Sequence, residues 1–194
     1  MPPVYAWTLP RVDSSLAAMF RIRPRRPLSR PLLVRPFLRP LFWASLLLAP
    51  AVGAFELQRM DDVRVNLDDF VGGGRWTLVQ LWTTDCIPCE RQKPMLEAFH
   101  REHAQSRAQV IGIALDGPDA MAEIEAVVAR HDPSYPTLVA FDDVFGEQFR
   151  ALTGKSFRAT PTYLLYAPDG AYAGVHTGPI DREQVERIVV GGAR

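Results

Sequence analysis

Residues 82–89 read Trp-Thr-Thr-Asp-Cys-Ile-Pro-Cys and decide the fold, because they join a predicted strand to a predicted helix. The preceding run, residues 77–82, is short, apolar and rich in strand formers, which predicts a buried strand. Residues 86–103 read as a helix that Pro94 would kink. The chain therefore places both of its cysteines at a strand-to-helix junction, with two residues between them.

A cysteine at the start of a helix is expected to be acidic. The first helical turn has unpaired N–H groups and a partial positive charge, and both favour a thiolate on Cys86. Cys89 lies one turn later, where we expect it to be more buried and within reach of Cys86. Thiol–disulfide exchange needs one exposed thiolate that attacks and a second thiol that resolves the mixed disulfide. The spacing predicts such a pair, and Pro88 is tolerated in the first turn.

Two cysteines are too few for a structural disulfide framework, and a bond across so short a loop stabilises a fold weakly. Zinc binding is the alternative, because His100 and His103 follow the cysteines. A continuous helix, however, separates Cys89 from His100 by about 16 Å at about 1.5 Å per residue, whereas zinc holds its ligands at about 2 Å. We therefore expect no metal or other cofactor beyond the redox-active disulfide. We expect His100 and His103 at the surface, and ordinary loop and strand roles for His131 and His176.

The remaining pattern predicts one α/β domain over residues 55–194. Residues 63–67 alternate like an edge strand, and a glycine-rich turn follows them. The further predicted elements are a strand at 110–115, a helix from Pro118 to Arg130, a shorter helix at 144–152, strands at 162–166 and 171–176, and a closing helix at 180–190. The turn Ala-Pro-Asp-Gly joins the last two strands as a hairpin. This order predicts a mixed central sheet flanked by helices.

Several features beyond the cysteines resemble the thioredoxin superfamily. They are residues 82–89, Pro94, the Thr160-Pro161-Thr162 triplet and Gly178. The resemblance implies that the Thr160–Pro161 bond is cis and that this proline lies against the cysteine pair and helps to present substrate backbone. It also implies that Gly178 lines the same groove. The residues expected to form and support this groove are Trp82, Asp85, Ile87, Pro88, Thr160, Pro161 and Gly178.

Within that superfamily the chain is similar to the TlpA/ResA-like branch. Between Cys89 and Pro161 it carries more residues than a minimal thioredoxin, which matches the strand–helix insert of that branch. Residues 67–70 and the turn at 167–170 match the branch as well. The resemblance implies an extracytoplasmic thiol:disulfide oxidoreductase with protein disulfides as substrates and a membrane electron donor for its re-reduction. Cytochrome c maturation is the best-known client process of this branch.

Four positions depart from the relatives or stand apart from them. Asp85 stands where the branch usually has Trp, and a carboxylate beside the first cysteine disfavours its thiolate, which favours the reducing direction. Gln80 stands where cytoplasmic thioredoxins have a buried Asp, so a proton-shuttling carboxylate is missing there. Gln92 stands where the branch often has Glu. Asp116 leaves two alternatives, a substitute acid near the second cysteine or a solvated loop end.

Residues 1–54 differ in charge from the rest of the chain. They carry eight arginines and one aspartate, whereas residues 55–194 have a net charge of −7. A basic segment, the apolar run at 41–49 and small residues up to Ala54 predict a secretory signal. The run is short for a membrane span of about 20 residues. An uncleaved membrane tether or a disordered basic tail is the alternative, and Met19 is an alternative start.

Taken together, these patterns predict a reductase exported to the bacterial periplasm, either free or tethered to the outer face of the inner membrane. The acidic domain argues against nucleic-acid binding, which needs cations facing the phosphates. Two alternatives remain: a thioredoxin-fold protein that handles metals or binds clients without redox turnover, and an oxidase or isomerase that forms disulfides. The spacing from Thr83 to Cys86 also occurs in peroxiredoxins, but Val79 occupies the place of their upstream proline.

Overall fold

The computed structural model describes residues 55–191, and the predicted signal or anchor in residues 1–54 lies outside them. The elements in chain order are β1 (Glu56–Arg59), β2 (Arg64–Asn66), η2 (Leu67–Asp69), β3 (Trp76–Trp82), α1 (Ile87–His103), β4 (Ala108–Ala114), η3 (Pro118–Ala120), α2 (Met121–His131), β5 (Thr137–Ala140), α3 (Asp142–Thr153), β6 (Thr162–Tyr166), β7 (Tyr172–Thr177) and α4 (Arg182–Gly191). No helix of this described part is long and apolar enough to cross a membrane.

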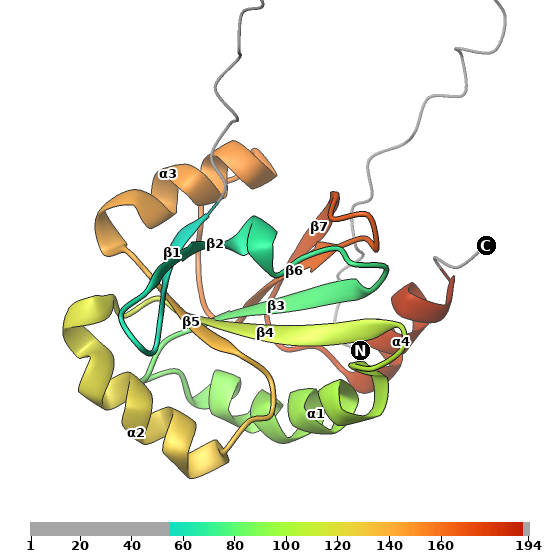
Figure 1. Cartoon of the computed structure of the whole chain (residues 1–194), viewed down its shortest axis with the longest axis horizontal. Coiled ribbons are helices and arrows are strands. Elements are labelled where there is room, and N and C mark those ends of the chain that lie inside the picture. Colours follow the sequence, from blue (N-terminus) through green and yellow to red (C-terminus); the bar gives the residue numbers. More distant parts are fainter. Residues whose placement is uncertain (1–54, 192–194) are drawn as a thin grey trace, which may run out of the picture. The chain divides into compact units, whose positions relative to one another are not determined.

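One seven-stranded sheet runs through the described domain in the order β2-β1-β5-β4-β3-β6-β7 (Figure 1). The three inner strands β3, β4 and β5 are parallel, and every other neighbouring pair is antiparallel. β2 lies at one edge, as its alternating pattern predicted, and β7 at the other. The predicted mixed α/β sheet of the thioredoxin-like type is confirmed.

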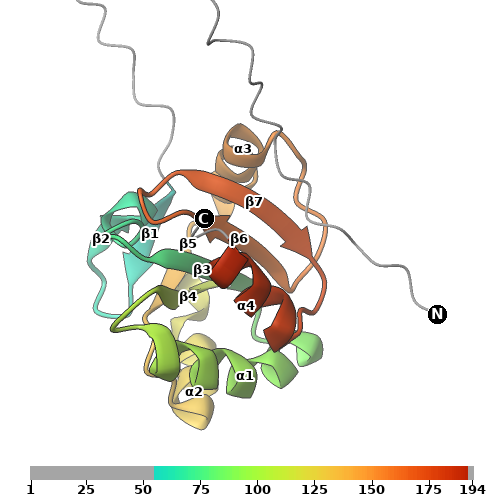
Figure 2. The same cartoon turned by 90° about the vertical axis from the view of Figure 1, so that its right-hand side faces the viewer.

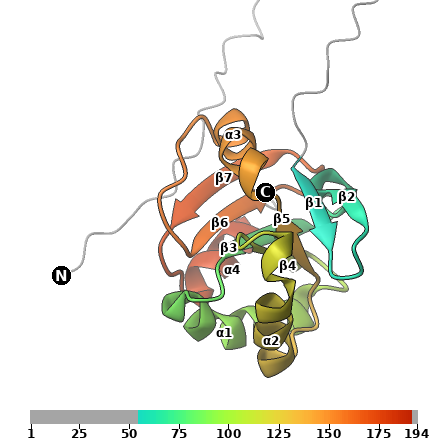
Figure 3. The same ribbon diagram turned by 90° about the vertical axis from the view of Figure 1, so that its left-hand side faces the viewer.

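The two faces of the sheet are covered by different helices, as Figures 2 and 3 show. Val79 of β3 packs in one core with Phe145 of α3. Its neighbour Leu78 packs in a second core with Leu96 of α1. Because side chains alternate along a strand, Gln80 and Trp82 also face the α1 side. α1 and α2 therefore cover the face on which β3 delivers the chain to the cysteines.

β1 and β5 were not predicted from the sequence, and both omissions have the same cause. Each strand is only four residues long, and β1 carries a single apolar residue, Leu57, between polar neighbours. Leu57 is nevertheless fully buried, because β1 pairs with β5 and β5 pairs with β4. Pairing between segments far apart in the sequence creates these strands, so local pattern does not reveal them.

The expectation that His100 and His103 are surface groups was wrong. His103 is 7% exposed and packs edge-on against Phe99, with ring centroids 4.7 Å apart. His100 is half-buried, and its Nδ1 accepts a hydrogen bond from the amide of Val110 at 3.0 Å. The end of α1 lies along β4, so its last turns are covered. His131 ends α2 instead of lying in a loop.

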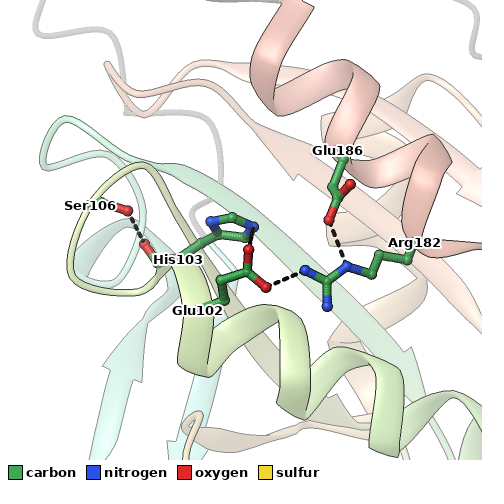
Figure 4. A network of polar contacts seen from close by, with 5 residues as sticks. All are labelled: Glu102, His103, Ser106, Arg182 and Glu186. Carbon is green, nitrogen blue, oxygen red and sulfur yellow. Dashed lines mark hydrogen bonds and ion pairs between the residues drawn. The ribbon is translucent and has the colours of Figure 1, made fainter.

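Polar contacts join the same end of α1 to α4 (Figure 4). Arg182 of α4 donates to Glu102 of α1 and, at 2.6 Å, to Glu186 on its own helix. The Arg182 hydrogen bond holds the pKa of the Glu102 carboxyl below its usual value. Ser106 donates its hydroxyl to the carbonyl of His103 at 3.1 Å. Exposed ion pairs add little stability, so we expect the Arg182–Glu102 contact to contribute little to the free energy of unfolding.

Candidate active site

Cys86 and Cys89 form a disulfide at the N-terminus of α1, with Cα atoms 5.2 Å apart. Cys86 is the N-cap of the helix, and its Sγ accepts a hydrogen bond from the amide of Cys89 at 3.2 Å. Cys86 is 7% exposed and Cys89 is fully buried. Cys86 is therefore less exposed than expected, but it is the more accessible sulfur, and a helix-end donor already contacts it.

The loop between β3 and α1 is held by Asp116, which follows β4. The amide of Thr84 donates to both carboxylate oxygens of Asp116 at 3.0 and 3.1 Å, and its hydroxyl donates at 2.7 Å. Asp116 is half-buried just after β4, so it is only partly solvated, and a role as a substitute acid near Cys89 stays a prediction. Its carboxylate fixes the loop that leads to Cys86, and the parallel pairing of β3 with β4 brings the two together.

The Thr160–Pro161 peptide bond is cis, as predicted. In the antiparallel β3–β6 pair, Leu81 lies opposite Thr162, so Pro161 directly precedes the residue that pairs near the end of β3. The amide of Gly178 donates to the carbonyl of Pro161 at 2.8 Å. Trp82, Pro161 and Gly178 therefore all lie at the end of the sheet where β3 leads into the cysteine loop.

The surface beside Cys86 is formed by its neighbours in the chain. Ile87 is 63% exposed, and Asp85 and Pro88 are exposed as well. Asp85 accepts a hydrogen bond from the hydroxyl of Thr83 at 2.8 Å, so the Thr83 hydroxyl proton is directed at Asp85 and away from Cys86. Ile87 leaves a large apolar side chain facing solvent next to the disulfide.

A buried network of uncharged polar groups lies on the α1 side of β3. Gln80 donates to the hydroxyl of Tyr163 at 3.3 Å, and that hydroxyl donates to Gln92 at 3.1 Å. Gln92 also accepts from the amide of Ile180 at 3.0 Å. Burial raises the pKa of Tyr163 far above its usual value, so the phenol stays neutral. The network contains no carboxylate, in agreement with the glutamines at positions 80 and 92.

A family model described as the AhpC/TSA family matches residues 49–172, which is more than half of the chain and includes both cysteines and Pro161. The chain belongs to the AhpC/TSA family.

Several proteins similar to this chain are named as enzymes of thiol–disulfide exchange. Thiol-disulfide oxidoreductase ResA from Halalkalibacterium halodurans is 24% identical over 135 residues, which cover 70% of this chain and 71% of the relative. The thiol:disulfide interchange protein from Chlorobium tepidum has a similar structure, with a TM-score of 0.58 and 21% identity over 71% of this chain and 92% of that one. A secreted disulfide oxidoreductase from Mycobacterium tuberculosis superposes with a TM-score of 0.56 and 15% identity over 71% of this chain and 96% of that one. The predicted resemblance and fold are confirmed, and the predicted enzyme class is the one that these names carry.

Sequence reasoning did not single out Lys93, a charged residue four positions after Cys89. It lies on α1, only 4% exposed, and its Nζ is 3.7 Å from the centroid of the Trp82 ring. Burial lowers the pKa of the Lys93 ammonium to about 8, and the charge of Glu90 opposes part of that shift. The available signal was its position four residues after Cys89, which places both side chains on one helix face.

The described residues contain no group of three or more His, Cys, Asp or Glu side chains that could hold a metal ion. α1 runs without a break from Ile87 to His103, with Pro94 inside it. The separation of Cys89 from His100 along a continuous helix, on which the argument against zinc depended, therefore holds in the structure.

Proposed function

We propose that the chain is an exported thiol:disulfide oxidoreductase that reduces disulfides of client proteins in the bacterial periplasm. One observation carries the proposal: the sulfur of Cys86 caps a helix and accepts the amide of Cys89, while Cys89 is buried behind it. A donor at that position stabilises a thiolate on Cys86 once the disulfide is reduced. Nucleophilic attack by such a thiolate is the first step of exchange.

The reaction follows from the different exposure of the two sulfurs. In the dithiol form, the Cys86 thiolate attacks one sulfur of a client disulfide, and the other client sulfur leaves as a thiolate that takes up a proton. Cys89 then loses its proton and attacks Cys86 Sγ, which forms the intramolecular disulfide and releases the second client thiol. The client gains two electrons, and the Cys86–Cys89 disulfide must receive two from a donor dithiol, which we propose belongs to a membrane protein.

The reducing direction is supported by Asp85. Its exposed carboxylate is adjacent to Cys86 in the chain and disfavours the thiolate, which weakens the dithiol form relative to the disulfide. Equilibration with glutathione or dithiothreitol buffers measures the reduction potential. A reductase should lie near thioredoxin, at about −270 mV, and a value near the strong oxidant DsbA, at about −120 mV, would instead identify a disulfide-forming enzyme.

Export is supported by the basic, apolar and small-residue segments within residues 1–54. A structural neighbour is described as secreted, and another, from Streptococcus pneumoniae, as an exposed lipoprotein. Fusing residues 1–54 to a reporter that is active only outside the cytoplasm tests the proposal. An active reporter supports export, and protease protection in spheroplasts contradicts it.

Clients can be identified with a C89S variant, in which Cys86 attacks but no second thiol resolves the product. We expect protein adducts that dithiothreitol releases and that a C86S variant does not form. Metal analysis of the anaerobically purified protein is the complementary test. One equivalent of zinc or copper bound through the two cysteines, without any exchange activity, would favour the metal-handling alternative.

A further inference from the structure

Lys93 is unusual in this chain, both in its residue type and in its location. Of the 22 lysines and arginines, only two are lysines, Lys93 and Lys155. Lys155 is exposed in the loop after α3, whereas Lys93 is 4% exposed. Lysine is the basic side chain that can lose its proton when buried, whereas arginine stays charged. Among the described residues, Lys93 is thus the one buried lysine or arginine.

The position of Lys93 is fixed relative to Cys89 and Trp82. Residues four apart on a helix lie on one face with Cβ atoms about 5–6 Å apart, so Lys93 and the fully buried Cys89 are neighbours on α1. The ammonium lies 3.7 Å from the centre of the Trp82 ring. Trp82 packs in one apolar cluster with Cys86 and Cys89. The cation therefore lies against a ring that belongs to the same apolar cluster as both cysteines.

Among the described residues, no acidic side chain forms an ion pair with the Lys93 ammonium. The charged and titratable groups facing it are Glu90, Glu97 and Arg101 on α1, Arg130 and His131 on α2, and Tyr135 before β5. Glu90 is engaged by Arg130 at 2.7 Å, and Glu97 accepts from the amide of Ser134 at 2.8 Å. Among the described residues, no hydrogen bond or ion pair reaches Lys93 Nζ, which lies over the Trp82 ring.

The polar groups on the α1 side of β3 and in the cysteine loop supply no other cation. Gln80, Gln92 and Tyr163 are neutral, and the carboxylate of Asp116 is bound by Thr84. Burial alone raises the pKa of a thiol, which would slow the step in which Cys89 becomes a nucleophile. A cation on the same helix face opposes that penalty.

We propose that Lys93 is a positioning residue of the redox site, the buried cation that favours the thiolate of Cys89. The inference deepens the proposed function and rests on it. In the mixed disulfide, Cys89 loses its proton, its sulfur bonds to Cys86 Sγ, and the bond from Cys86 to the client sulfur breaks. The client leaves as a thiolate and takes up a proton. Negative charge passes through Cys89 Sγ in this step, and the Lys93 ammonium stabilises it through space.

The test measures the acidity of Cys89 without any client. In a C86S background, thiolate absorbance at 240 nm against pH reports the pKa of Cys89 alone. We expect C86S/K93M to raise that pKa by about one unit, a tenfold loss of thiolate below the transition. C86S/K93R keeps a charge and should keep most of the original value. C86S/K155M is the matched control and should titrate like C86S.

The folding of each variant is checked by circular dichroism, and C86S/K93Q replaces K93M if the latter does not fold. An unchanged Cys89 pKa in a folded K93M or K93Q protein would overturn the proposal, as would equal shifts in K93M and K93R. Failure of the proposed function is distinguishable, because it appears as absent disulfide exchange by the wild-type chain. If the wild-type chain is active, the K93M variant should also release a trapped client about tenfold more slowly at neutral pH. The difference between the two proteins should be smaller at high pH.

Discussion

The amide of Cys89 donates a hydrogen bond to Cys86 Sγ at 3.2 Å, so the second cysteine contributes its backbone to the first before any sulfur chemistry takes place. The same residue closes the helical turn, because its amide also donates to the Cys86 carbonyl at 3.0 Å. In the proposed reaction, attack by Cys86 and resolution by Cys89 would therefore take place within one helical turn. Asp116 holds the loop before this turn, Ile87 lies exposed beside it, and Lys93 is buried one turn after Cys89.

Asp116 should stabilise both the domain and the cysteine loop. In D116A, the Thr84 amide and hydroxyl lose their acceptor, and a part-buried hydrogen bond to a charged group is worth about 1–3 kcal/mol. We expect unfolding free energy to fall by about that amount in urea denaturation, with slower disulfide exchange. Asp119 is exposed and serves as the matched control, D119A. Equal midpoints for the two variants would show that the loop does not depend on Asp116.

Removing the charge of Asp85 should make the dithiol form more favourable. In D85N, Cys86 loses an adjacent carboxylate, so the pKa of its thiol should fall by about half a unit and the reduction potential should rise. Iodoacetamide alkylation against pH measures the thiol, and glutathione equilibration measures the potential. E125Q, on the exposed side of α2, controls for net charge. A potential that moves down in D85N would contradict the assigned direction of the Asp85 effect.

Ile87 should contact clients. The side chain is 63% exposed beside Cys86, and burying an isoleucine contributes about 1.5–3 kcal/mol. I87S should therefore raise KM for a protein disulfide such as insulin about tenfold and leave the reaction with a small aromatic disulfide almost unchanged. Val63 is 48% exposed in the turn between β1 and β2, so V63S is the control. Equal losses with both substrates would instead mean that I87S disturbs the cysteines themselves.

His100 should make stability depend on pH between neutral and mildly acidic conditions. Burial lowers the pKa of His100 below its ordinary value, and its Nδ1 accepts the Val110 amide only when unprotonated. The folded state thus binds this proton less readily than the unfolded chain. The contribution of His100 is complete above the unfolded pKa of about 6.5 and declines as pH falls towards the folded value. In H100N this part of the decline should disappear from urea midpoints measured between pH 7.5 and 5.

The fold and the cysteine pair could be predicted because their signals are local. The apolar run of β3, the helix that starts at Cys86 and the hairpin after β6 all lie in continuous segments. Asp116 and Lys93 could not be assigned in this way. Asp116 reaches Thr84 only because β4 pairs in parallel with β3, and Lys93 is buried only because Trp82 and α2 cover that face. A charged residue on a helix otherwise predicts a side chain that is exposed to solvent.

The scarcity of lysine also has a practical consequence. Amine-reactive reagents act on unprotonated, accessible amines, and in the described domain Lys155 is the exposed candidate while Lys93 is covered. Lys155 follows α3, on the face of the sheet opposite α1. Coupling the described domain to a sensor surface through its lysine side chains would therefore use Lys155 in preference to Lys93. The disulfide end of α1 would stay open to solution, ready for capture of unknown binding proteins in a defined orientation.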